Sequence, residues 1–107
     1  MASFSDMNTL RQDTAFQGRV RAAMISACIN IVNEAVGAYH RERQTYAVQI
    51  LNSPDQFVDL FSSTVATDMT VIADATAGGT VQQSNVTDQH IANAIGGQFN
   101  SFFRTPA

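Results

Sequence analysis

The feature that most constrains the fold is a proline-free stretch from about Asp13 to Val36, in which Gly18 is the only glycine. Apolar and small residues recur along it at steps of three and four, the spacing of one face of an α-helix. These residues are Phe16, Val20, Ala23, Ala27, Ile31 and Ala35, with Met24, Cys28 and Val32 widening the face. We therefore predict one long amphipathic helix with a broad buried face, whose alanines allow another helix to approach closely.

Capping signals predict further helices on both sides of this one. Ser5 or Asp6 is a suitable N-cap for a short first helix, and Gly37 is a suitable end for the long one. The sequence leaves open whether Gly37 breaks the helix or only bends it. A third helix is expected from about residue 39 to 51, with an apolar face that consists of Tyr46, Ala47, Ile50 and Leu51.

Two more helices follow in the second half of the chain. Ser53 fits an N-cap and Pro54 the first helical position, so a fourth helix is expected to about residue 68. Its expected buried side consists of Phe57, Leu60, Phe61, Val65 and Met69. The last helix, capped by Thr87 and Asp88, runs through Ile91, Ile95, Phe99, Phe102 and Phe103. The pair Gly96–Gly97 inside it costs about 2 kcal/mol relative to alanine, which predicts either a closely packed neighbouring backbone or a break.

Residues 70–86 lack helical periodicity and begin with threonine, valine and isoleucine, which favour extended structure. Gly78–Gly79 is suited to the turn of a short hairpin between Val71–Ile72 and Thr80–Val81, and a loop without strands is the alternative. Long unstructured loops are uncommon inside compact domains and are often functional. We therefore expect this segment to be an arm that reaches a neighbouring subunit and is flexible in the isolated monomer.

These elements predict a mainly α fold, a small bundle of four to five helices with a long loop or short β-hairpin arm around residues 70–86. The 107 residues suit a single domain, numbered 1–107, in which residues 99–107 are expected to be a C-terminal anchor. The two phenylalanines near the end of the chain either belong to the core or insert into a partner.

Charged residues make up only 14% of the chain, against about 25% in an average domain. Residues 1–52 hold five arginines and four acidic residues, whereas residues 53–107 hold one arginine and five aspartates. This asymmetry is either solvated surface charge or a means of head-to-tail contact between identical copies. No basic stripe is present, so sequence-specific binding of nucleic acid is not expected. No signal peptide and no membrane-spanning segment are predicted either.

The sequence offers little to suggest catalysis or metal binding. His40, His90 and Cys28 are far apart and lack the spacing of metal ligands, and a single cysteine excludes an intrachain disulfide. Asp55 and Asp59 share a helix face that is expected to be solvated. We predict no catalytic, cofactor-binding or metal-binding residue, and therefore a protein that is not an enzyme and needs no cofactor.

Three stretches of the chain, residues 16–24, 46–54 and 86–102, carry a resemblance to a known group. They read Phe-Gln-Gly-Arg-Val-Arg-Ala-Ala-Met, Tyr-Ala-Val-Gln-Ile-Leu-Asn-Ser-Pro, and Val-Thr-Asp-Gln-His-Ile followed by Ala94–Ile95 and Phe99–Asn100. Together they resemble small structural proteins encoded among the head and neck genes of tailed bacteriophages. The resemblance implies a virion protein, made in the host cytoplasm, that acts as a head–tail connector or adaptor in a ring on the portal.

The implied partners are further copies of the chain, the portal, and other neck, tail or capsid proteins, with only passive contact to passing DNA. Capsid decoration is a second role that the resemblance allows. A small DNA-associated regulatory protein is the alternative, supported by the arginines of the first half. The residues expected at interfaces are Arg41, Arg43, Val71, Ile72, Val81, Phe99, Phe102, Phe103 and Arg104.

Overall fold

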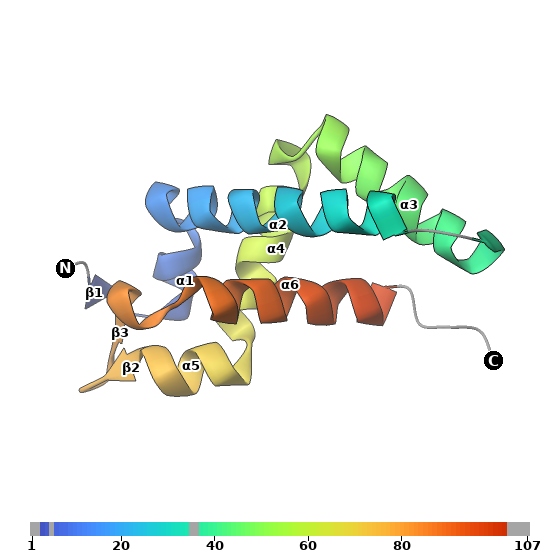
Figure 1. Cartoon of the computed structure of the whole chain (residues 1–107). Helices are drawn as coiled ribbons and strands as arrows, with labels where there is room; N and C mark the ends of the chain where they lie inside the picture. The colour runs from blue at the N-terminus through green and yellow to red at the C-terminus, as the bar shows by residue number, and fades with distance from the viewer. Residues whose placement is uncertain (1–2, 5, 35–36, 103–107) are drawn as a thin grey trace.

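The computed structural model describes residues 3–4, 6–34 and 37–102, and these form a helical bundle with a small β-sheet at one end (Figure 1). In chain order the elements are β1 (Ser3–Phe4), α1 (Met7–Arg11), α2 (Thr14–Glu34), α3 (Gly37–Asn52), α4 (Asp55–Thr67), α5 (Met69–Ala75), β2 (Thr76–Ala77), β3 (Thr80–Gln82), the 3₁₀ turn η1 (Gln83–Asn85) and α6 (Asp88–Phe102). The mainly α fold and the short hairpin predicted from the sequence are confirmed.

Helix α2 is the central element of the bundle. It packs against α3, α4 and α6, and α6 runs beside it in the same direction (Figure 1). Helix α3 follows α2 after a short connection and returns along it, while α4 packs against both α2 and α6. The molecule is elongated as a result, with principal extents of 48 × 28 × 17 Å.

The core is built on the predicted face of α2, where Phe16, Val20, Met24 and Cys28 are completely buried. Ala23, Ala27 and Ile31 of the same face are only partly buried. Three aromatic ring contacts then join the other helices: Tyr46 lies 5.8 Å from Phe57 and 6.1 Å from Phe99, and Phe61 lies 5.6 Å from Phe99. Edge-to-face and tilted contacts of this kind add to the stabilisation from burial alone.

The predicted buried side of α4 is partly wrong. Leu60 is 45% exposed and Met69 is 76% exposed, and the buried residues are Val58, Phe61, Ser62, Val65 and Ala66. Helix α4 ends at Thr67, and Asp68 has an extended backbone, so Met69 begins a new helix in a new direction. The helical spacing that selected Met69 therefore does not extend past Asp68.

Residues 70–86 pack against the rest of the described chain. The Asp68 carboxylate accepts hydrogen bonds from the backbone N–H groups of Thr70 (3.0 Å) and Val71 (3.3 Å), which caps α5. Val71–Ile72 is therefore helical, and the first hairpin strand is Thr76–Ala77. Buried side chains of this segment, namely Val71, Ala75, Val81 and Val86, attach it to the core.

The glycine turn of the hairpin is where the sequence predicts it. Gly78 and Gly79 have φ angles of +60° and +85°, which glycine adopts without steric cost. The sheet has the order β1-β3-β2 with antiparallel pairing, in which Phe4 lies opposite Val81 and Ala77 opposite Thr80. The N-terminal strand therefore covers the outer edge of the hairpin.

Candidate interaction surface

Three ion pairs join arginines of the first half of the chain to aspartates of the second half. They connect Arg11 to Asp59 (3.7 Å), Arg19 to Asp88 (2.9 Å) and Arg21 to Asp55 (3.3 Å). The charge asymmetry of the sequence is therefore largely neutralised within one chain.

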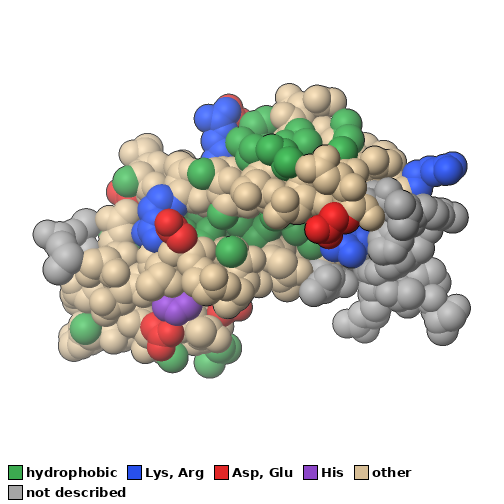
Figure 2. All heavy atoms as spheres, in the orientation of Figure 1, with side chains coloured by type: hydrophobic (Ala, Val, Ile, Leu, Met, Phe, Trp, Pro, Cys, Tyr) green, Lys and Arg blue, Asp and Glu red, His purple; other side chains and the backbone are tan. Residues whose placement is uncertain are grey.

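The largest hollow described on the surface lies between the parallel helices α2 and α6. It has a volume of about 450 Å³ and is open to solvent. Its lining residues, here called the groove, are Arg19, Ala22, Ala23, Ser26, Ala27, Asn30, Asp88 and Ala92. Figure 2 shows the hollow as an apolar strip between the two helices, with a basic and an acidic side chain together at its left end.

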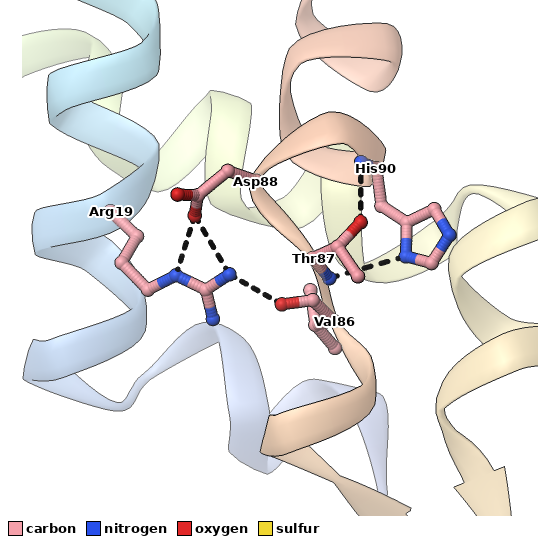
Figure 3. A network of polar contacts seen from close by, with 5 residues as sticks. All are labelled: Arg19, Val86, Thr87, Asp88 and His90. Atoms are coloured by element: carbon pink, nitrogen blue, oxygen red, sulfur yellow. Dashed lines mark hydrogen bonds and ion pairs between the residues drawn. The ribbon is translucent and has the colours of Figure 1, made fainter.

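Arg19 fixes the end of the groove. Its Nε and one terminal nitrogen donate hydrogen bonds to the same carboxylate oxygen of Asp88, at 3.1 and 2.9 Å, and the terminal nitrogen also bonds the carbonyl of Val86 (Figure 3). The guanidinium thus holds the first turn of α6 and the residue pair before it against α2. Because α6 starts here beside the second turn of α2, the groove runs from this ion pair along both helices.

The sequence suggests that the glycine pair of α6 marks either a closely packed neighbouring backbone or a break in the helix. Neither is found in the described residues. Helix α6 is continuous through Gly96 and Gly97, and a Cβ added to either glycine would meet no atom within 4 Å. Gly96 follows Asp88 and Ala92 at steps of four, so it continues the groove-facing side of α6 by one turn. The described part of the chain therefore leaves open space beside the two glycines, which are the residues of α6 with the lowest helix propensity.

A second apolar surface lies on the other flank of α2, along its seam with α3. Gln44 donates a hydrogen bond to the carbonyl of Val32 at 3.3 Å, which sets the antiparallel register of the two helices. Val48 follows Gln44 by four residues on α3, and Ile29 precedes Val32 by three on α2, so the antiparallel register places them near the same level; these side chains are 40% and 47% exposed. Ile29, Val48 and the half-buried Ile25 are here called the ridge. Figure 2 shows a group of apolar side chains along the upper part of the molecule.

His90 contacts a carboxylate but has the geometry of a structural link. Its Nε2 lies 2.8 Å from an oxygen of Asp74, and its Nδ1 accepts a hydrogen bond from the backbone N–H of Thr87 at 3.3 Å (Figure 3). The Thr87 hydroxyl accepts from the backbone N–H of His90 instead of facing the ring. A histidine that activates a nucleophile needs the hydroxyl on a ring nitrogen, which is not the case here. The contacts of His90 instead join α6 to α5.

Several residues expected at interfaces are core residues. Val71 is completely buried, Val81 is 4% exposed and Phe99 is 2% exposed, so the structure corrects the expectation for these three. Their apolar side chains fill the chain's own interior. Ile72 is partly buried and therefore contributes little surface.

Of the remaining expected interface residues, Arg41 and Arg43 lie on α3. Arg41 is exposed, and Arg43 is half-buried with an Nε atom that has no hydrogen-bond partner in the described structure. The side chain of Phe102, and all of Phe103 and Arg104, lie outside the described residues. The groove was not predicted as a site, although the alanines of α2 and the glycine pair were its signals.

Within residues 3–4, 6–34 and 37–102, no group of three or more histidine, cysteine or acidic side chains is placed to hold a metal ion. No helix in these ranges has the length and apolar character to cross a membrane. Cys28 is buried, and this burial raises the pKa of its thiol to about 11. A thiol with that pKa is almost entirely protonated at neutral pH, which makes it a poor nucleophile or metal ligand.

Comparisons with protein-family models, with curated proteins and with solved structures returned no match. The groove and the ridge are therefore interpreted from their own residues.

Proposed function

We propose that this chain is a structural subunit that assembles with copies of itself, of the head–tail connector or adaptor type found in tailed bacteriophages. In this role it forms a ring on the portal and takes part in tail attachment. The phage assignment is supported by the three sequence stretches described above. Capsid decoration is the second role for a subunit of this type.

The observation that carries the assembly proposal is the position of Gly96 and Gly97. Two glycines inside a helix lower its stability by about 2 kcal/mol relative to alanine. No atom of the described chain lies where their side chains would be, so packing among the described residues does not account for them. A close-fitting neighbour outside the monomer does account for them, because glycine and alanine let a second backbone approach.

The alternative of a DNA-associated regulatory protein depends on free arginines in the first half of the chain. Arg11, Arg19 and Arg21 are each paired with an aspartate, which removes much of their attraction for phosphate. Arg41 and Arg43 alone give a small basic surface. We therefore favour the structural subunit.

Electron microscopy and light scattering of the purified chain, alone and mixed with the portal protein from the same genome, test the proposal. We expect oligomers or rings whose formation or stability increases with the portal present. A chain that stays monomeric at every concentration and does not bind the portal contradicts the proposal. Binding to duplex DNA that weakens steeply with salt would instead support the alternative.

A further inference from the structure

We infer that the groove of one copy receives the ridge of the next copy, so that identical chains join head to tail. The inference rests on the proposed function, and it names the two surfaces that meet. The groove is on the α6 flank of α2, whereas the ridge is on the α3 flank. Each copy can therefore use both surfaces at once, which is the requirement for a ring or a filament and is not met by a self-pairing surface.

The sizes of the side chains on the two surfaces are complementary. The wall residues of the groove are mainly alanine and serine, which leave a hollow, whereas Ile29 and Val48 project from the ridge. Large apolar side chains that fill a hollow lined with small ones exclude water from both surfaces, which favours association.

The spacing along the helices also matches. On the ridge flank of α2, Arg21, Ile25 and Ile29 follow one another at steps of four residues, or about 6 Å per step at the rise of an α-helix. Asp88, Ala92 and Gly96 follow at the same steps along the groove flank of α6. When the two helices lie parallel, Arg21 of one copy can meet Asp88 of the next, with Ile25 above Ala92 and Ile29 above Gly96.

The charges at the start of each surface are complementary in this register. The side chain of Asp88 is 90% exposed although it is paired with Arg19, and that of Arg21 is 49% exposed although it is paired with Asp55. Docking brings the Arg21 guanidinium of one copy to the Asp88 carboxylate of the next. The Arg19–Asp88 pair at the groove and the Arg21–Asp55 pair beside the ridge each have a net charge of zero. No net electrostatic repulsion therefore opposes contact between the two surfaces.

The first test compares self-association of four variants by sedimentation equilibrium. Ile29→Ala removes a ridge side chain and Ala92→Leu fills the groove, and each should weaken association about tenfold or more. Their matched controls are Leu60→Ala, at an exposed leucine of α4, and Ala73→Leu, at an exposed alanine of α5. The controls should remain within about twofold of the original chain, since neither lies on the groove or the ridge.

The second test is a crosslink between two single-cysteine chains, both with Cys28→Ala. One carries Ile29→Cys and the other Gly96→Cys, which has open space for the new side chain. Mild oxidation of the mixture should give a heterodimer, while each chain oxidised alone should remain uncrosslinked. If each chain forms homodimers when oxidised alone, and the mixture gives no excess of heterodimer over them, the head-to-tail contact is wrong.

The outcomes separate this inference from the proposed function. If the original chain never associates, the assembly proposal and the inference are both wrong. If it associates but Ile29→Ala and Ala92→Leu behave like their controls, the chain assembles through another surface and only the inference is wrong.

Discussion

Arg19 and Asp88 lie 69 residues apart in the sequence and are joined by two hydrogen bonds, which hold the start of α6 to the first half of α2. The same guanidinium bonds the carbonyl of Val86. One side chain therefore sets where α6 begins, how it runs beside α2 and where the groove ends. The contact involves only one end of the groove, yet the geometry of the whole proposed interface depends on it.

Removal of Arg19 should destabilise the chain more than removal of its ion-pair partner. Arg19→Ala loses the bonds to Asp88 and Val86, and we expect a loss of about 1–2 kcal/mol in the free energy of unfolding. Asp88→Ala keeps the bond to Val86 and breaks only a solvent-exposed pair, which is worth at most about 1 kcal/mol. Urea denaturation followed by circular dichroism measures both values.

Arg41→Ala is the control for loss of an exposed arginine, and it should change the free energy of unfolding by less than about 0.5 kcal/mol. An Arg19→Ala variant as stable as this control would show that the link between α2 and α6 contributes little to folding.

The glycines of the hairpin and of α6 should respond in opposite directions to alanine. Gly97→Ala adds a methyl group in open space on a helix, so we expect stabilisation by up to about 1 kcal/mol. Gly79→Ala forces an alanine to a φ of +85° and should destabilise the chain by about 1 kcal/mol or more. Thermal unfolding of the two variants at a concentration that keeps the chain monomeric gives the comparison. Equal effects in both would contradict the backbone argument.

The helices could be predicted from the sequence because their signals are local. The apolar spacing from Phe16 to Cys28 and the caps at Asp6 and Thr87 depend on residues within one or two turns. In the structure, Asp6 accepts a hydrogen bond from the backbone of Thr9 at 2.7 Å, and this bond lowers the pKa of its carboxyl. Thr87 accepts the equivalent bond from His90 at 3.1 Å.

Residues 70–75 were misread because two local signals compete there. Thr70, Val71 and Ile72 have side chains that favour strands, but the preceding Asp68 caps a helix. The cap and the burial of Val71 and Ala75 outweigh the strand preference, so the hairpin begins only at Thr76. Such an outcome depends on what the rest of the chain packs against this segment, which no short window of sequence contains.

The groove could not be predicted because it is a relationship between α2 and α6. The sequence shows alanines at helical spacing on one helix and a pair of adjacent glycines on the other. That the alanines of α2 and the Asp88 and Ala92 side chains of α6 line one hollow follows only from the parallel pairing of the helices, to which the Arg19–Asp88 ion pair contributes. The ion pairs were missed for the same reason, since each joins residues far apart in the chain.

Phe99 should behave as a core residue in mutational tests. Its ring contacts those of Tyr46 and Phe61, and its side chain is almost completely buried. We expect Phe99→Ala to lower the free energy of unfolding by about 3–5 kcal/mol, which is enough to unfold a chain of marginal stability. Phe99→Leu keeps most of the apolar volume and should lose much less. A Phe99→Ala chain that remains folded but fails to assemble would instead place this ring at an interface.

Cys28 should be unreactive in the folded chain and should make stability depend on alkaline pH. Burial raises the thiol pKa from the ordinary 9.0 to about 11, so the folded state favours the protonated thiol. The resulting stabilisation is complete below pH 9 and is lost as the pH rises through 11, because the unfolded chain then releases the proton more readily. Cys28→Ala lacks this contribution.

The difference in unfolding free energy between the original chain and Cys28→Ala should therefore shrink from pH 8 to pH 11, as measured by urea denaturation. Groups that titrate alike in both chains cancel in the difference; Tyr46 does not cancel fully, because burial and then the charge of the Cys28 thiolate raise the pKa of its hydroxyl. At pH 8 an aromatic disulfide reagent should label the folded thiol at least about a thousandfold more slowly than the urea-unfolded one, because labelling requires exposure of the core. Rapid labelling of the folded chain, or a difference that stays constant with pH, would show that Cys28 is accessible to solvent and that α2 is not held against the core at this position.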